Sequence, residues 1–249
     1  MRLDQLVLER GLAATRSQAQ ALLLGGRVRV GDGDAARIDR KPGDLVPPET
    51  SITLIAAAAF VSRGGEKLAG ALDAFGIVVA GLVGLDVGAS TGGFTDCLLQ
   101  RGASRVYALD VGRGQLAESL RADPRVVSME RTHARRLDPD DPQAITIGER
   151  VDIAVVDVSF ISVTRLLGGI AHHVRPGGTI VSLVKPQFES QPREVPKGVV
   201  RDAEVQARAV ERVRATAIAL GLEVRGEAES VLRGPSGNRE FFLHLVRSS

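Results

Sequence analysis

Hydrophobic residues near the start of the chain recur at the spacing of an amphipathic helix. Residues 1–24 contain two such patterns, and Thr15 stands where its side chain can cap the second predicted helix. Alternating hydrophobic and polar residues over 28–30 and 51–55 then predict two short strands. Residues 1–59 are therefore expected to form a small α+β domain.

From residue 66 onward, short and nearly continuous hydrophobic runs alternate with segments of helical periodicity. Such runs are typical of parallel strands that helices cover on both faces. The last two runs are joined by Pro235-Ser236-Gly237-Asn238, which indicates an antiparallel pair. The pattern predicts an α/β fold, a Rossmann-like class I methyltransferase sheet of seven strands with the last one antiparallel. The predicted strands are 83–87, 105–109, 126–129, 151–156, 179–184, 222–231 and 241–246, and the predicted helices are 67–75, 94–101, 115–121, 163–173 and 203–220.

A change of composition separates the two parts. Four alanines at 56–59 are followed by Phe-Val-Ser-Arg-Gly-Gly at 60–65. We interpret 60–65 as a short linker rather than a long flexible tether. The predicted organisation is thus a first domain over 1–59, this linker, and a methyltransferase-like domain over 66–249.

The composition is that of an ordinary globular protein, with 44% hydrophobic and 25% charged residues among 249. A net charge of +2 allows nucleic-acid binding through a local patch but does not argue for it. The single cysteine, Cys97, excludes an internal disulfide and suggests a reducing compartment. The most hydrophobic stretch, 75–85, is shorter than the roughly 20 residues that span a bilayer. Since the start also lacks the apolar core of a signal peptide, we expect a soluble, cytoplasmic protein.

A glycine-rich turn over 88–93 follows the first strand of the second domain. Glycines let the backbone approach a ligand closely. Ser90 stands where the nicotinamide fingerprint needs its second glycine, and Asp86 precedes the turn, so we expect S-adenosylmethionine rather than NAD. Asp110 ends the next strand, where a carboxylate can accept both hydroxyls of a ribose. The residues expected to bind the cofactor are Asp86, Gly88, Ala89, Ser90, Thr91, Gly92, Gly93, Phe94, Asp110, Val111, His133 and Asp157.

His133 follows the third strand of this domain. Its side chain is equally compatible with a contact to the adenine of the cofactor and with a simple cap of the loop. No cysteine or second histidine stands at metal-ligand spacing from it. We therefore expect no metal site.

Four ionisable residues stand at the ends of predicted elements. Lys67 precedes a helix, Asp157 and Lys185 each follow a hydrophobic strand, and Glu240 opens the last strand. Because the carboxyl ends of parallel strands meet at one crevice, we expect the four to gather there as an active site. Each also has a plainer interpretation. Lys67 can be an exposed helix residue and Asp157 the cap of a turn, while Lys185 can be a loop residue and Glu240 the start of a strand. Glu189 is a rival carboxylate, but its loop is expected to form a substrate flap.

Two stretches of the first domain resemble the S4 RNA-binding module: Thr15-Arg16-Ser17-Gln18-Ala19 and Gly26-Arg27-Val28-Arg29-Val30. The resemblance covers about residues 1–55 and implies contacts with RNA phosphates. Charge alone implies little, because residues 1–59 hold eight basic and seven acidic side chains. Solvated surface arginines are the alternative. The residues expected to contact RNA are Arg2, Arg16, Arg27 and Arg29, with Arg63 and Lys197 in the second part of the chain.

Five motifs stand out along the chain: Ser62-Arg63-Gly64-x-x-Lys67-Leu68, Asp86-x-Gly88-Ala89-Ser90-Thr91-Gly92-Gly93-Phe94-Thr95, Asp157-x-Ser159-Phe160-Ile161-Ser162, Lys185-Pro186-Gln187-Phe188-Glu189 and Gly234-Pro235-Ser236-Gly237-Asn238-x-Glu240. Together they resemble the TlyA family, whose members are called haemolysins yet are similar to FtsJ-like ribose methyltransferases. The resemblance spans nearly the whole chain and implies 2′-O-methylation of cytidine in ribosomal RNA of the small and sometimes the large subunit. It also implies a catalytic tetrad of Lys67, Asp157, Lys185 and Glu240. His133 departs from the asparagine expected in relatives.

Within that tetrad, Lys185 is the expected general base for a ribose hydroxyl, with Lys67 as the neighbouring cation that favours its neutral form. Asp157 is expected to orient Lys185, and Glu240 to hold Lys67 or the hydroxyl. Two other classes of function remain: a membrane-lytic protein, and a non-catalytic RNA-binding or ribosome assembly factor. The first would need a membrane-active segment, which the sequence does not show. Intact acids and lysines argue against the second.

Overall fold

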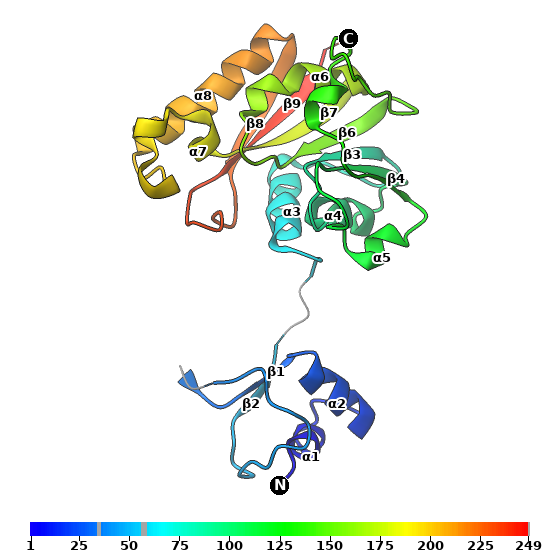
Figure 1. The fold of residues 1–249 in the computed structure, drawn as a ribbon, viewed down its shortest axis with the longest axis vertical. Coiled ribbons are helices and arrows are strands. Elements are labelled where there is room, and N and C mark those ends of the chain that lie inside the picture. Colours follow the sequence, from blue (N-terminus) through cyan, green and yellow to red (C-terminus); the bar gives the residue numbers. More distant parts are fainter. Residues whose placement is uncertain (34–35, 56–58, 249) are drawn as a thin grey trace. The chain divides into compact units, whose positions relative to one another are not determined.

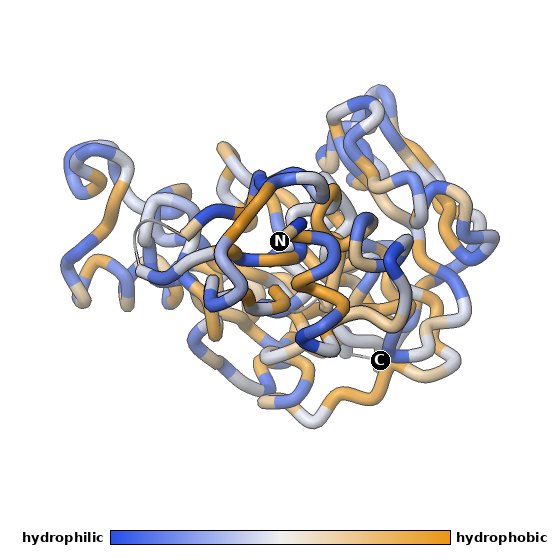
Figure 2. Tube along the Cα trace, turned by 90° about the horizontal axis from the view of Figure 1, so that it is seen from below, coloured by the Kyte–Doolittle hydropathy of each residue, from blue (hydrophilic) through white to orange (hydrophobic). Residues whose placement is uncertain are grey.

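A computed structural model of the chain describes residues 1–33, 36–55 and 59–248. It divides the chain into two compact units, Met1–Ala58 and Ala59–Ser249, which are described separately below. Short hydrophobic segments alternate with hydrophilic ones along the trace (Figure 2). Within the described residues, we find no helix with the length and hydrophobicity needed to cross a membrane.

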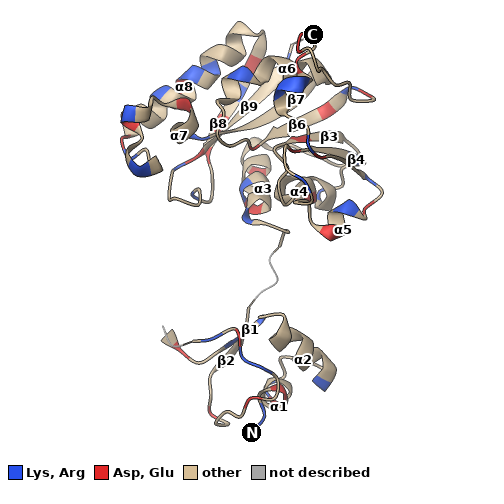
Figure 3. Cartoon of the chain, in the orientation of Figure 1, with Lys and Arg blue, Asp and Glu red and all other residues tan. Residues whose placement is uncertain are grey.

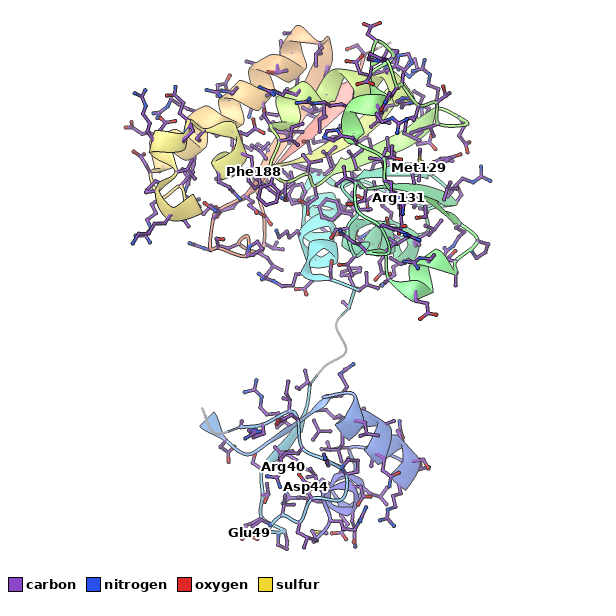
Figure 4. All side chains as sticks on the ribbon, viewed as in Figure 1. Arg40, Asp44, Glu49, Met129, Arg131 and Phe188 are labelled. Atoms are coloured by element: carbon purple, nitrogen blue, oxygen red, sulfur yellow. The ribbon has the colours of Figure 1, made fainter. Side chains whose placement is uncertain are left out.

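The first unit is a small α+β module, as the hydrophobic pattern predicts. The Thr15 hydroxyl accepts a hydrogen bond from the backbone N–H of Gln18 and so caps the second helix, as expected. On its surface, Arg40 and Asp44 lie side by side (Figure 4), with a guanidinium nitrogen 2.7 Å from a carboxylate oxygen. The elements are α1 (Leu3–Glu9), α2 (Arg16–Leu24), β1 (Val28–Val30) and β2 (Ile52–Leu54), with β1 and β2 antiparallel. The core consists of Leu3, Leu6, Val7, Ala13, Ala19, Leu23, Val28, Val30 and Val46.

The second unit is built on a seven-stranded sheet in the order β5-β4-β3-β6-β7-β9-β8 (Figure 1). β9 is antiparallel to both of its neighbours, and the other strand pairs are parallel. This confirms the predicted class I methyltransferase sheet. The strands are β3 (Val83–Val87), β4 (Arg105–Leu109), β5 (Val126–Met129), β6 (Val151–Val156), β7 (Val174–Val184), β8 (Leu222–Glu229) and β9 (Phe241–Arg247).

Helices cover both faces of this sheet, and each face has its own hydrophobic core (Figure 1). One core packs α3 and α4 against the strands, and the other packs α6 and α8. Because both faces are buried, the inner strands are hydrophobic at successive positions. The helices are α3 (Arg63–Phe75), α4 (Gly93–Gln100), α5 (Glu118–Arg121), α6 (Leu167–His173), α7 (Pro186–Glu189) and α8 (Ala203–Ala219), with short 3-10 turns at Ala134–Leu137, Val163–Arg165, Pro192–Glu194 and Pro196–Gly198.

The segment 60–65 is not the linker that the composition suggests. Helix α3 already begins at Arg63, and Phe60 packs against the core that α3 and α4 share. The Val61 N–H also donates to the Asp96 carboxylate of α4 at 2.8 Å. A phenylalanine and a valine can bury against the second unit, so this segment belongs to it. The alanines at 56–58 lie outside the described residues.

Two predicted helices also differ from the structure. Predicted helix 163–173 is divided into a 3-10 turn and α6, and predicted helix 115–121 is helical only from Glu118. In the second case, the N–H of Ala117 donates to the Thr91 carbonyl in the glycine-rich turn at 3.1 Å. Because of this contact with the glycine-rich loop, residues 115–117 do not form the first turn of the helix.

Candidate active site

A cleft of about 530 Å³ lies where the parallel strands end. It brings together the helix start at Lys67, the glycine-rich turn after β3, and the loops that follow β6 and β7. Three of the four ionisable residues singled out from the sequence, Lys67, Asp157 and Lys185, line this cleft, and Glu240 contacts Lys67 from behind. The lining residues are Ser62, Arg63, Gly64, Lys67, Gly88, Ala89, Ser90, Thr91, Gly93, Phe94, Asp157, Ser159, Lys185, Arg233 and Pro235.

Lys185 and Asp157 form one ion pair at this cleft. They follow the adjacent parallel strands β7 and β6, and Lys185 Nζ lies 2.5 Å from Asp157 Oδ1. Nζ also donates to the Ser159 hydroxyl at 2.9 Å. The Lys185 side chain is 11% exposed and the Asp157 side chain is 22% exposed. The pair is therefore largely enclosed by protein but can be reached from the cleft.

Lys67 and Glu240 form a second pair behind the first. Lys67 Nζ lies 2.5 Å from Glu240 Oε2, across 173 residues of sequence. Lys67 is 7% exposed and Glu240 1% exposed, so Lys67 is not the exposed helix residue of the plainer interpretation. Since Glu240 compensates the charge of Lys67, Lys67 does not act as the uncompensated cation that we expected beside Lys185.

The turn before β9 packs tightly on the Glu240 carboxylate. Gly234 lies so close that a Cβ built on it would meet Glu240 Oε1 at 2.4 Å. Oε1 itself is buried without a hydrogen-bond partner among the described residues. Gly234 of the Gly234-Pro235-Ser236-Gly237-Asn238 motif is therefore required by close packing against a buried carboxylate.

The glycine-rich turn after β3 depends on backbone conformations that side chains disfavour. Gly88 has φ +89° and Gly92 has φ +98°, and the non-glycine residue Ser90 also adopts a positive φ of 48°. A Cβ on Gly88 would meet the Asp157 carbonyl oxygen at 2.5 Å. Only glycine therefore allows the turn to lie against the loop that carries Asp157.

Asp86 does not line the cleft, in contrast to the expectation that it faces the cofactor. It is fully buried, and its Oδ2 accepts hydrogen bonds from the Thr95 N–H at 2.9 Å and the Thr95 hydroxyl at 2.7 Å. Burial raises the pKa of Asp86 to about 7, and the nearby Asp157 charge adds to the shift. The physical reason is that Asp86 lies inside β3, one residue before the strand ends, where helices cover both faces of the sheet. Its observed contact ties the start of α4 to β3.

Asp110 lies at the end of β4, as expected, and supports the same turn. Its carboxylate accepts the Ser90 N–H at 2.8 Å and the Gly112 N–H at 2.6 Å. Ionised carboxylates have about four acceptor sites, so two backbone bonds leave capacity for hydroxyl groups. The next residue, Val111, is 62% exposed and forms an apolar surface beside it.

His133 caps the 3-10 turn that follows it, which is one of the two alternatives left open by the sequence. Its Nδ1 accepts the Arg135 N–H at 3.1 Å. Its side chain lines a separate cavity of about 500 Å³ with Phe160 and Phe188, not the small cavity beside Asp110. The residues described contain no cluster of His, Cys, Asp or Glu suited to a metal ion.

Phe160, in the loop after β6, lines the same separate cavity as His133, and the sequence pattern gives it no role. It is 92% exposed, has a positive φ of 65°, and its ring lies 5.3 Å from that of Phe188 on α7, which Figure 4 labels. An exposed phenylalanine in a strained conformation is uncommon away from functional sites. Its position three residues after Asp157 is the feature of the sequence that indicates a place near the site.

Glu189 is not a rival of the two ion pairs. It is 3% exposed, and it accepts hydrogen bonds from the Ser162 hydroxyl at 2.5 Å and the Val163 N–H at 2.8 Å. Burial raises its pKa. Glu189 therefore ties the loop that carries Asp157 to the segment that carries Lys185, which fixes the two loops relative to each other.

Comparisons with known proteins agree with this geometry. Residues 60–247 match the model of the FtsJ-like methyltransferases, and residues 1–33 match that of the S4 domain. The chain is 49% identical to the 16S/23S rRNA (cytidine-2′-O)-methyltransferase TlyA of Mycobacterium tuberculosis, over 98% of this chain and 89% of the relative. It is 43% identical to the putative rRNA methyltransferase YqxC of Bacillus subtilis, over 98% and 85%. A putative hemolysin from Streptococcus thermophilus has a similar structure, with a TM-score of 0.74, 40% identity and coverage of 100% of this chain and 89% of that one.

The chain belongs to the TlyA family. Membership makes it an S-adenosylmethionine-dependent methyltransferase preceded by an S4 domain. The cleft suits that cofactor in three respects, which are the close backbone approach at Gly88, the partly exposed Asp157 carboxylate and the free acceptor capacity of Asp110. Residues 88–94, Asp110 and Asp157 are those that would hold the cofactor.

Replacing Gly88 by alanine is expected to lower the affinity for S-adenosylmethionine by about tenfold or more, because strain and overpacking each cost roughly 1–3 kcal/mol. Gly76→Ala is the matched control, since Gly76 has a similar φ of +65° but a Cβ on it would meet no atom within 4 Å. Calorimetric titration with S-adenosylmethionine measures the effect, and thermal unfolding separates it from a loss of fold. Equal affinities in the two variants would contradict this account of the turn.

The arginines of the S4 unit differ in how free they are to contact RNA. Arg2 and Arg16 both pair with the buried Asp4 carboxylate, at 3.0 and 3.1 Å, and these contacts hold the pKa of Asp4 well below its usual range. Arg27 donates to the Ile55 carbonyl. Arg29 is exposed on β1, between two buried valines. Part of the predicted RNA set thus also stabilises the unit itself.

The two RNA candidates outside the S4 unit also have different surroundings. Arg63 donates to the Arg233 carbonyl at 3.1 Å and lines the cleft. Lys197 is exposed, with a positive φ of 53°, in the 3-10 turn Pro196–Gly198. Arg63 therefore stays a candidate near the reacting groups. Lys197 is a candidate in the segment 190–202 between α7 and α8, which is called the flap below.

Proposed function

We propose that the protein is an S-adenosylmethionine-dependent ribosomal RNA 2′-O-methyltransferase that acts on cytidine in 16S rRNA, 23S rRNA or both. The observation that carries the proposal is the placement of two lysine–carboxylate pairs at one cleft, beside a glycine-rich turn. The M. tuberculosis relative, at 49% identity over 98% of the chain, supports the substrate. The S4 match over 1–33 supports an RNA partner.

In this proposal, Lys185 takes the proton of the ribose 2′-hydroxyl. S-adenosylmethionine, when bound, supplies an activated sulfonium methyl group, so the protein needs mainly alignment and a base. A neutral amine has two N–H donors and one lone pair. The Ser159 hydroxyl accepts one of these donors, and the Asp157 carboxylate lies in ion-pair contact with Nζ. Together they orient the amine, and the lone pair is left for the hydroxyl proton.

Lys67 and Glu240 have a different role in the proposal, because both are buried. Their pair fixes a positive group at the wall of the cleft, and the close contact of Gly234 fixes the carboxylate. A positioned ammonium group there stabilises negative charge as it develops on the ribose oxygen. Lys67 thus orients the hydroxyl and Glu240 orients Lys67.

Incubation of the purified protein with tritiated S-adenosylmethionine and separated small and large ribosomal subunits tests the function. The expected result is label on the ribose of one or a few cytidines, which mapping of the modified nucleotides identifies. Subunits already methylated at those positions should take up no label. Label on bases rather than riboses would overturn the assignment.

A further inference from the structure

A second cavity of about 460 Å³ lies next to the cleft, between the flap that follows α7 and the turn that precedes β9. Figure 3 shows basic residues along this flap and on α8. Three arginines line the cavity, and its lining includes neither aspartate nor glutamate. The lining residues are Val199, Val200, Arg201, Gln206, Arg233, Ser236, Gly237 and Arg239.

The three arginines are not equally available to a ligand. Arg239 is committed to Glu229, with its guanidinium nitrogens 2.8 and 2.5 Å from the carboxylate oxygens. Neither Arg201 nor Arg233 has a carboxylate within ion-pair distance among the residues described, and both are exposed. Arg233 makes only a long contact, 3.4 Å, to the Gly237 carbonyl. Two guanidinium groups therefore line this cavity without an ion-paired carboxylate, and such groups are suited to binding a phosphate.

Buried polar side chains hold the walls of this cavity in place. Asn238 is 2% exposed, accepts the Val200 N–H at 2.9 Å and donates to the Gly198 carbonyl at 2.9 Å. Gln206 is 4% exposed and donates to the Val200 carbonyl at 2.8 Å. These bonds join the flap to the turn and to α8, so Arg201 projects from a fixed backbone segment.

Arg233 also connects this cavity to the active site, because it lines both. We propose that the cavity binds a phosphodiester group of the substrate RNA chain, next to the ribose in the cleft, through Arg201 and Arg233. The inference rests on the proposed function, because it requires an RNA strand that continues out of the cleft. The Ser236 hydroxyl offers a further donor to a phosphate oxygen.

Arg201→Ala and Arg233→Ala test this site, with Arg150→Ala as the matched control. Arg150 is an exposed arginine just before β6, at the opposite end of the parallel strands. Each test variant should raise the KM for ribosomal subunits about tenfold, because a phosphate contact positions the RNA but does not react. Arg201→Ala, which does not line the cleft, should also leave kcat at saturation unchanged. The slope of log affinity against log salt should become shallower by about 0.7–1 for each arginine removed. Arg201→Lys should recover part of the affinity, and calorimetric binding of S-adenosylmethionine should be unchanged in all variants.

The outcomes separate the two proposals. If the wild-type protein labels ribose but Arg201→Ala and Arg233→Ala keep the KM and salt slope of Arg150→Ala, the phosphate site is wrong and the function stands. If the test variants lose kcat instead of affinity, the arginines act on the reacting groups, and the phosphate site is again wrong. If the wild-type protein labels neither subunit although it binds the cofactor, the proposed function itself fails.

Discussion

Replacing Lys185 by alanine is expected to lower the rate of methyl transfer by about 10²–10⁴-fold, the usual contribution of a general base. The affinity for S-adenosylmethionine should stay nearly unchanged, because Lys185 contacts Asp157 and Ser159 and not the glycine-rich turn. Single-turnover incorporation of a tritiated methyl group into ribosomal subunits measures the rate, and calorimetry measures cofactor affinity. Near-normal turnover in this variant would refute the role of base.

Lys185→Arg separates a base from a fixed positive charge at the same position. Arginine keeps the charge and can still donate to Asp157 and Ser159, but it is not deprotonated in proteins. If Lys185 takes the proton, the arginine variant should be nearly as inactive as the alanine variant. If Lys185 serves only as a cation, arginine should restore much of the rate. Lys41→Ala, in the S4 unit, is a control for the loss of an exposed lysine.

The sheet is the part of the fold that the sequence predicts best. β3, β4, β5 and β6 have the bounds that their hydrophobic runs predict, because the inner strands of a sheet covered on both faces are hydrophobic at most positions. The ends of helices and strands are harder to predict where hydrophobic and polar residues are mixed. The linker predicted at 60–65 is wrong, because the pairing of Phe60 and Val61 with α3 and α4 depends on tertiary contacts that composition does not reveal.

The sequence predicts which residues stand at strand ends and therefore near the cleft. It does not predict in which direction each side chain points. Asp157 and Lys185 follow strands, and the parallel topology brings them together. Asp86 has a similar sequence context, yet its position inside β3 turns its carboxylate into the core. The hydrogen bonds that Glu189 accepts from Ser162 and Val163 join two loops 26 or 27 residues apart, and no spacing in the sequence indicates them.

The buried pair Lys67–Glu240 should give the largest effect on stability. Glu240→Ala is expected to lower the free energy of unfolding by about 3–5 kcal/mol, because it leaves the Lys67 ammonium buried without its partner. Glu149→Ala is the matched control. Glu149 pairs with Arg105 at 2.6 Å, but the two side chains are 38% and 51% exposed, so its loss should cost at most about 1 kcal/mol. Urea unfolding followed by circular dichroism measures both.

The double variant Lys67→Met/Glu240→Met separates stability from chemistry at the same place. Methionine fills a similar volume without a charge, and replacing a buried ion pair by hydrophobic residues is often neutral or stabilising. The double variant should therefore recover most of the stability that Glu240→Ala loses. It should nevertheless remain inactive, because no ammonium group is left at the wall of the cleft to orient the ribose hydroxyl. Recovery of methyl transfer along with stability would show that the pair only holds α3 against β9.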